Sequence, residues 1–132
     1  MKKETIQMMD KILDSEMVGY AYINPRGGGN RQRFFISTTP DNMANFLGSH
    51  TAGADKLTIT DMCDRPILEA ADGVITNSKS PDLRRKVNVC LAAIQKGTRQ
   101  AGEVLEVSRR EADLYFLAED QAVTEAECRM TL

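Results

Sequence analysis

The chain has 132 residues, a formal net charge of −2 and a hydrophobic fraction of 42%. These values are ordinary for a soluble globular domain, and a chain of this length buries enough surface to fold without a disulfide or metal staple. The sequence contains no Trp and only seven Phe and Tyr residues, so Leu, Ile, Val and Met must supply most of the core. We therefore expect residues 1–132 to form a single domain.

The first segment, MKKETIQMMDKILDS, carries two lysines but no long apolar run, and acidic residues interrupt it. This pattern argues against a signal peptide and against a transmembrane helix, so we expect no membrane partner. Apolar residues recur at helical spacing between residues 3 and 14 and predict an amphipathic helix.

A hairpin and a short helix are predicted next. Segments 18–24 and 33–38 are rich in β-branched and aromatic residues, which is typical of strands. A glycine-rich loop separates them, so an antiparallel hairpin is expected. Thr39 can cap a short helix over residues 40–47, and Gly48 is its expected stop.

The middle of the chain predicts three more strands. Alternation of apolar and polar residues indicates a half-buried strand at 56–62. Two short apolar runs, 66–70 and 74–77, flank Asp72-Gly73, a dipeptide that tolerates the positive φ of a tight hairpin turn. A second hairpin is therefore expected here.

The clearest helix spans 81–96, with a Ser-Pro-Asp start and a glycine stop. Residues 103–107 predict a further strand. The capping-box spacing of Ser108 and Glu111 favours a helix over 109–127. Alternation at the end of this segment would also suit a strand, so two structures stay open there.

These elements predict an α+β fold with a mainly antiparallel sheet and three to four helices packed on it. RFFISTTPD and DGVITNSKSPD each run from an apolar strand into a Ser/Thr-Pro-Asp helix start, 41 residues apart. One interpretation of this weak internal repeat is that the chain contains two ββα-like units. The other is that Ser/Thr-Pro-Asp is simply a good helix start, and the fold class is the same under both.

The three cysteines, Cys63, Cys90 and Cys128, are too few and too widely spaced for a disulfide framework. Isolated cysteines in odd number indicate a reducing compartment, so a cytoplasmic location is expected. No pair has the spacing of a zinc knuckle, and His50 is the single histidine. We therefore expect neither a metal nor a cofactor.

The loop PRGGGNRQR is the first candidate binding site. Backbone N–H groups that lack side chains can form a concave anion site, and flanking arginines can hold phosphate oxygens through paired hydrogen bonds. The motif is neither a Walker A sequence nor a dinucleotide-binding glycine motif, and a flexible hairpin tip explains the glycines. The anion-site hypothesis therefore depends more on the arginines than on the glycines. Its residues are Arg26, Gly27, Gly28, Gly29, Asn30, Arg31 and Arg33.

Two further basic clusters lie at predicted helix starts. Arg84, Arg85 and Lys86 occupy a first turn, where the helix dipole disfavours each positive charge by about 0.3–1 kcal/mol. An anionic ligand would offset that cost, and a helix N-terminus itself attracts anions. Arg109 and Arg110 repeat the arrangement. The clusters either converge on one ligand or form a solvated basic face.

The charge is unevenly distributed. Residues 1–100 carry 14 Lys and Arg against 11 Asp and Glu, a charge of +3, whereas residues 101–132 carry 3 against 8, a charge of −5. A basic body and an acidic end can bind an anion or pair head to tail with a second copy, and uneven scatter is also common in short chains. The modest total favours a small phosphorylated ligand, such as a nucleotide, over a nucleic acid.

We therefore expect a small non-enzymatic binding protein for a phosphate-bearing ligand, forming a homo-oligomer, such as a microbial or phage accessory protein. One alternative is a regulator or inhibitor that acts by protein contact through the acidic end or the methionine-rich first helix. Another is a small hydrolase or transferase that uses Asp61 and Cys63, with His50 as a partner. Carboxylates beside a cysteine oppose formation of the thiolate nucleophile, which weighs against this second alternative.

Overall fold

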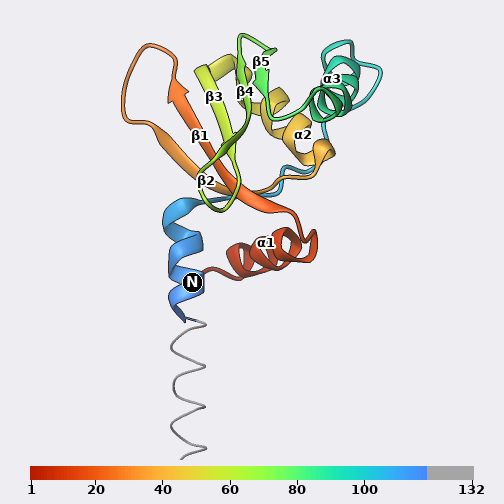
Figure 1. The fold of residues 1–132 in the computed structure, drawn as a ribbon. Helices are drawn as coiled ribbons and strands as arrows, with labels where there is room; N and C mark the ends of the chain where they lie inside the picture. The colour runs from red at the N-terminus through yellow and green to blue at the C-terminus, as the bar shows by residue number, and fades with distance from the viewer. Residues whose placement is uncertain (119–132) are drawn as a thin grey trace, which may run out of the picture.

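The protein is described here by a computed structural model that covers residues 1–118. Its strands form one antiparallel six-stranded sheet in the order β5-β4-β3-β1-β2-β6 (Figure 1). The strands are β1 (Val18–Pro25), β2 (Gln32–Ser37), β3 (Ala54–Thr60), β4 (Pro66–Ala71), β5 (Val74–Ser78) and β6 (Glu106–Ser108). The helices are α1 (Lys3–Asp14), α2 (Pro40–His50), α3 (Pro81–Gln95), the short 3-10 helix η1 (Thr51–Gly53) and a helix over residues 109–118. The predicted α+β class is confirmed.

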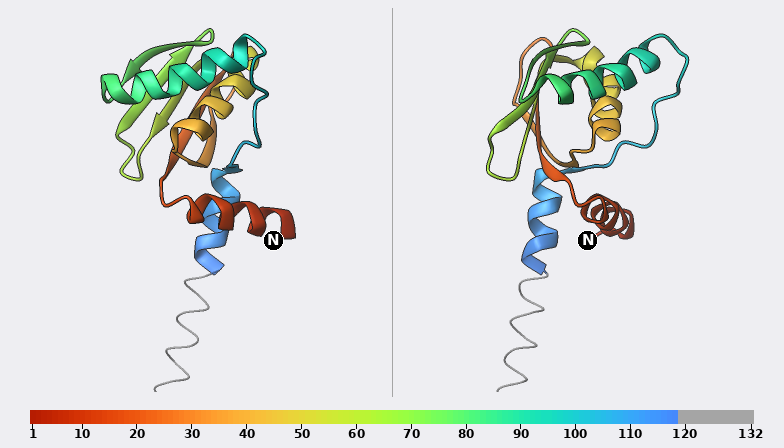
Figure 2. Two further views of the ribbon diagram at one scale, coloured as in Figure 1. Left: turned by 90° about the vertical axis from the view of Figure 1, so that its right-hand side faces the viewer. Right: turned by 45° about the vertical axis from the view of Figure 1, so that its right-hand side comes forward.

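The four α-helices divide between the two faces of the sheet. Alternate residues of a strand point to opposite faces. On β2, Phe34 and Ile36 pack in the core beneath α2 and α3, whereas Phe35 packs with α1 and the 109–118 helix. Figure 2 shows α2 and α3 side by side on one face, with α1 and the 109–118 helix gathered at one end of the sheet. None of the described helices is both long and apolar enough to cross a bilayer.

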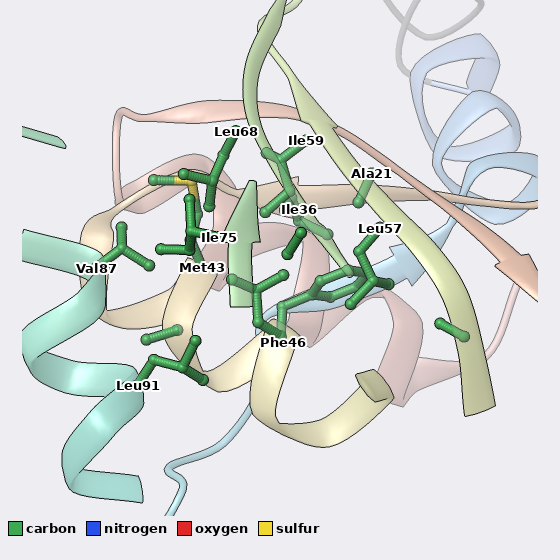
Figure 3. Packing of buried hydrophobic residues seen from close by; sticks show 14 of the residues in the cluster. Ala21, Ile36, Met43, Phe46, Leu57, Ile59, Leu68, Ile75, Val87 and Leu91 are labelled. Atoms are coloured by element: carbon green, nitrogen blue, oxygen red, sulfur yellow. The ribbon is translucent and has the colours of Figure 1, made fainter. Parts of the chain in front are cut away.

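The larger core lies between the sheet and the pair α2–α3 (Figure 3). Its fully buried members come from both helices and from the central strands, and include Ile36, Met43, Phe46, Ile59, Leu68, Ile75, Val87 and Leu91. The edge-to-face contact of Phe34 with Phe46 joins β2 to α2, with 5.8 Å between the ring centroids, inside the usual range of about 4.5–7 Å. The larger core is mostly aliphatic, as the composition predicts, and Phe46 is its fully buried phenylalanine.

A second, smaller core lies between the sheet, α1 and the 109–118 helix. Met9 and Ile12 of α1 and Ala112 of the 109–118 helix pack around Phe35, which is fully buried. The Phe35 ring lies 5.6 Å from the ring of Phe116 and 6.1 Å from that of Tyr20. Phe35 therefore anchors the 109–118 helix to the sheet.

Local signals explain most element boundaries. The Thr39 hydroxyl accepts a hydrogen bond from the Asn42 N–H, and Ser80 does the same for Leu83, so both predicted helix caps are confirmed. At the second hairpin Asp72 and Gly73 both have positive φ, at 52° and 79°. These angles fit the tight turn that the Asp-Gly pair predicts.

Three predicted boundaries are wrong. Helix α2 does not stop at Gly48 but runs to His50, whose ring lies 4.5 Å from that of Phe46. The strand expected at 56–62 is Ala54–Thr60, and the strand expected at 103–107 is Glu106–Ser108. Of the helix expected over 109–127, residues 109–118 are helical and the rest lies outside the described residues.

The late start of β6 has a tertiary cause. Asn42 of α2 is buried, and its side chain donates to the carbonyls of Ser37 and Leu105 and accepts from the Leu105 N–H. Asn45 accepts from the Gly102 N–H. These bonds, together with one from the Ser37 N–H of β2 to the Leu105 carbonyl, hold the segment before β6 against α2 and the end of β2.

Candidate anion-binding site

A cleft of about 540 Å³ opens between the β1–β2 hairpin and the 109–118 helix. Its lining includes four arginines, and we call it the arginine cleft: Arg31, Arg33, Arg109 and Arg110. The sheet register explains this convergence. Phe34 of β2 pairs with Ser108 of β6, so the residues that follow Ser108 emerge beside the residues that precede Phe34. Two of the three predicted basic clusters therefore meet here.

Two tyrosines of β1 support two of the guanidinium groups. Tyr20 and Tyr22 face the same side of the sheet because they are two residues apart. The Arg109 guanidinium carbon lies 3.8 Å from the Tyr20 ring centroid, and that of Arg31 lies 4.3 Å from the Tyr22 ring centroid. Cation–π contacts at these distances hold the guanidiniums against the sheet and limit their conformational freedom.

A hydrogen-bond network continues from the arginines to the β3–β4 turn. Arg109 Nη1 donates to the Tyr22 hydroxyl at 3.4 Å, and that hydroxyl donates to the Asp64 carboxylate. Asp64 also accepts from the Thr60 hydroxyl at 3.3 Å, and its φ of 61° lies in the left-handed region. The turn is thus shaped to present its carboxylate to Tyr22.

This environment predicts a pH dependence of stability. Burial, and then the hydrogen bond to Asp64, raise the pKa of the Tyr22 phenol above its ordinary value of about 10. The folded state therefore holds the phenol proton more tightly than the unfolded state, and the protonated phenol adds to the free energy of unfolding. This stabilisation is fully present at pH values below the ordinary pKa of about 10. It is lost as the pH rises through the higher pKa of the folded protein.

We therefore expect the free energy of unfolding, measured by urea titration at a series of alkaline pH values, to fall less steeply in Tyr22→Phe than in the wild type. In Asp64→Asn the acceptor charge is gone, so absorbance titration should show the Tyr22 pKa moving back down. A wild-type Tyr22 that ionises at or below its ordinary pKa would contradict this account.

The arginines of the cleft are short of negative partners. Within residues 1–118, Arg31, Arg33 and Arg110 make no ion pair. Arg109 Nε lies 3.7 Å from a carboxylate oxygen of Asp113, and in the described part of the chain this buried nitrogen has no hydrogen-bond partner. A buried donor without an acceptor is costly, and the nearest carboxylate oxygen, that of Asp113, lies beyond hydrogen-bond distance of this nitrogen.

The glycine loop itself does not contribute to the lining. Gly27, Gly28 and Gly29 all have positive φ, which glycine adopts without strain, and so they shape the hairpin tip. Arg26 turns away from the cleft: its guanidinium donates to Asp72 and to the carbonyls of Ala52 and Ala54. Asn30 is exposed and lies outside the lining as well.

The cluster at the start of α3 belongs to a different part of the molecule. Arg84 donates to the Ile75 carbonyl at 2.7 Å, and Arg85 and Lys86 both pair with Asp82. Arg85 and Lys86 line a separate hollow of about 430 Å³ between the starts of α2 and α3, which shares no lining residue with the arginine cleft. Arg84 and Arg85 are therefore placed apart from Arg31, Arg33 and Arg109.

The thiol of Cys90 is half-buried and borders this second hollow. It donates to the Asp41 carboxylate at 3.1 Å. That hydrogen bond, and then burial, raise the pKa of Cys90 and keep the group in its thiol form.

Asp61 and His50, which the hydrolase or transferase alternative would use, are both held by hydrogen bonds or ion pairs within the fold. Asp61 accepts from the N–H groups of Cys63 and Arg65 and from the Arg65 guanidinium, and so it organises the β3–β4 turn. His50 is the last residue of α2, and its Nε2 lies 2.7 Å from the Glu106 carboxylate. No hydrogen bond or ion pair in the described residues joins His50 to Cys63.

Sequence reasoning did not include several residues of the site. Arg110 was recognised as basic but not assigned to binding, and Leu114 and Leu117 form the apolar side of the cleft. Asp64 was not among the predicted binding residues, and it orients Tyr22 by accepting a hydrogen bond from its hydroxyl. An amphipathic pattern in the 109–118 helix was the available signal for the leucines; no sequence signal links Asp64 to Tyr22, 42 residues away.

Among residues 1–118, no three His, Cys, Asp or Glu side chains gather as a candidate metal site. Comparisons of the chain with protein-family models, with curated protein sequences and with solved structures found no match.

Proposed function

We propose that this protein binds a phosphate-bearing small molecule, of which a nucleotide is the simplest example, in the arginine cleft. The observation that carries the proposal is the convergence of four arginines on one cleft, of which three, Arg31, Arg33 and Arg110, make no ion pair within the described residues. Arginine matches phosphate oxygens with two parallel hydrogen bonds, so this group of donors suits phosphate better than a single carboxylate.

The shape of the cleft supports a compact ligand. Its volume falls within the range of roughly 300–1,000 Å³ that is usual for small-molecule sites. The lining combines arginines with the apolar side chains of Leu114 and Leu117, and it includes one carboxylate, that of Asp113. A nucleotide has both kinds of group, since its phosphates would meet the arginines and its base would lie against the leucines. The overall charge of −2 disfavours a long polyanion as the ligand.

Isothermal titration of the full chain at low salt, with ATP, ADP, AMP, adenosine and inorganic phosphate in turn, tests the proposal. Affinity should rise from AMP to ATP because more arginines find a phosphate oxygen, and adenosine should not bind. The proposal fails if none of these ligands binds, or if adenosine binds as tightly as ATP.

Two matched variants locate the site. Arg110 and Arg85 are both exposed and lie in the first turn of a helix or close to it. Arg110→Ala should weaken ATP binding about tenfold or more, because it removes a charged hydrogen bond. Arg85→Ala should leave the affinity unchanged, since Arg85 is paired with Asp82 at the other hollow. The opposite pattern would place the ligand at the start of α3.

A further inference from the structure

Two tyrosines of β1 hold the Arg109 guanidinium in place. It lies over the Tyr20 ring, with 3.8 Å between the guanidinium carbon and the ring centroid, and its Nη1 donates a hydrogen bond to the Tyr22 hydroxyl at 3.4 Å. The Arg109 side chain is 30% exposed and lines the cleft. Arg109 is therefore fixed in two directions before any ligand arrives.

The hydrogen bond from Arg109 depends on where the Tyr22 hydroxyl directs its proton. A phenol has one proton to donate and lone pairs that accept, whereas a guanidinium can only donate and a carboxylate can only accept. The Tyr22 hydroxyl donates to the Asp64 carboxylate, so its lone pairs remain for Arg109. Donation to a charged acceptor also polarises the hydroxyl oxygen and makes it a better acceptor. Asp64 therefore acts on Arg109 through Tyr22.

The β3–β4 turn keeps Asp64 in this position. The Asp64 N–H donates to the Asp61 carbonyl at 3.1 Å, and the Asp64 carboxylate accepts from the Thr60 hydroxyl. The φ of Asp64, 61°, lies in the left-handed region, which glycine occupies at the least cost. The backbone of the turn by itself does not require an aspartate. What a glycine could not supply is the carboxylate that Tyr22 contacts.

The sign of the expected effect separates this role from simple electrostatics. A carboxylate near an anion site repels the ligand through space, and because Asp64 is exposed, water weakens that repulsion. Ordering Arg109 acts in the opposite direction, since an arginine that is already fixed loses less conformational freedom when a phosphate binds. If Asp64 acts through Tyr22, removal of this negative charge weakens the binding of an anion.

We propose that Asp64 and Tyr22 are positioning residues of the arginine cleft, which hold the Arg109 guanidinium in the orientation that receives a phosphate. Neither residue lines the cleft itself. The effect on ligand affinity rests on the proposed function. The effect on Arg109 is present without any ligand and is measured separately.

Asp64→Gly and Tyr22→Phe are the test variants. Glycine fits the positive φ of the turn, and phenylalanine keeps the ring on which the Arg31 guanidinium lies, so both changes spare the fold. Asp72→Gly is the matched control. Asp72 is also exposed, also has a positive φ, at 52°, and carries the same charge outside the cleft.

Isothermal titration of the full chain with ATP at low salt measures the affinity. Asp64→Gly and Tyr22→Phe should each weaken binding about two- to tenfold, the cost of ordering one arginine side chain at the moment of binding. In the Tyr22→Phe background, Asp64→Gly should cause no further loss and a small gain, because only its charge effect remains. Asp72→Gly should bind ATP as the wild type does. Asp64→Gly that binds ATP as tightly as the wild type or more tightly, or losses that add in the double variant, would overturn the proposal.

Nuclear magnetic relaxation of the Arg109 Nε–Hε group in the ligand-free chain gives a second measure, which does not depend on the proposed function. The order parameter of this group should fall in Asp64→Gly and in Tyr22→Phe and stay unchanged in Asp72→Gly. If ATP does not bind the wild type, the proposed function fails, and this order parameter still decides whether Asp64 positions Arg109. A group that stays equally ordered in all three variants overturns the positioning role, whatever the result with ATP.

Discussion

Phe35→Ala should lower the free energy of unfolding by about 3–5 kcal/mol, the usual cost of removing a buried phenylalanine ring. Phe35 is fully buried and lies at the centre of the smaller core, between Tyr20 of β1 and Phe116 of the 109–118 helix. The loss is a large part of the roughly 5–15 kcal/mol that stabilises a typical domain. Urea denaturation followed by circular dichroism measures it directly.

The position of Phe35 adds a more specific expectation. Its ring holds the 109–118 helix to the sheet, so hydrogen exchange of the amides in residues 109–118 should accelerate more than that in α2 or α3. Phe34→Ala is the matched control, because Phe34 is the neighbouring residue on the opposite face and is only half-buried. It should cost less and accelerate exchange chiefly in α2. Equal losses and equal exchange patterns would contradict the division into two cores.

Reversing two charges of the arginine cleft should abolish ATP binding. In Arg31→Glu/Arg33→Glu two donors are lost and two negative charges face the phosphates, so the affinity should fall at least about 100-fold. Both side chains are exposed and Arg33 makes no ion pair within residues 1–118, so the fold should survive. Titration calorimetry at low salt, with circular dichroism to check folding, gives the result.

Lys79→Glu/Lys96→Glu is the control for net charge. These two lysines are exposed and do not line the cleft, and the double variant changes the formal charge by the same amount. ATP affinity should fall only slightly in it, and less as salt is raised, because charges separated by more than about 10 Å are screened at 0.1 M salt. An equal loss in both double variants would mean that general charge, rather than the cleft, attracts the ligand.

Local patterns in the sequence predicted most of the fold. The amphipathic spacing in α1, the Thr39 and Ser80 caps and the Asp72-Gly73 turn depend on interactions within a few residues, and each is found as expected. Where prediction was wrong, a distant contact decided the outcome. Helix α2 passes Gly48 because His50 packs on Phe46 and pairs with Glu106.

The candidate site was predictable only in part, because sequence shows where charges are but not what pairs with them. Arg26, Arg31 and Arg84 look alike as members of basic clusters. In the fold Arg26 is bound by Asp72 and Arg84 by the Ile75 carbonyl, whereas within residues 1–118 the Arg31 guanidinium has no ion pair and lies over the Tyr22 ring. The meeting of Arg33 with Arg109 depends on the pairing of β2 with β6, strands that are far apart in the chain.

The central claim is that phosphates bind in the arginine cleft. The most direct test is to follow the side-chain Nε–Hε resonances of all arginines by nuclear magnetic resonance while ATP is added to the full chain at low salt. The signals of Arg31, Arg33, Arg109 and Arg110 should move with the same dissociation constant, because these four arginines line the cleft. The signals of Arg26, Arg84 and Arg85 should stay in place. Shifts confined to Arg84 and Arg85, or no shift at any arginine, would contradict the claim.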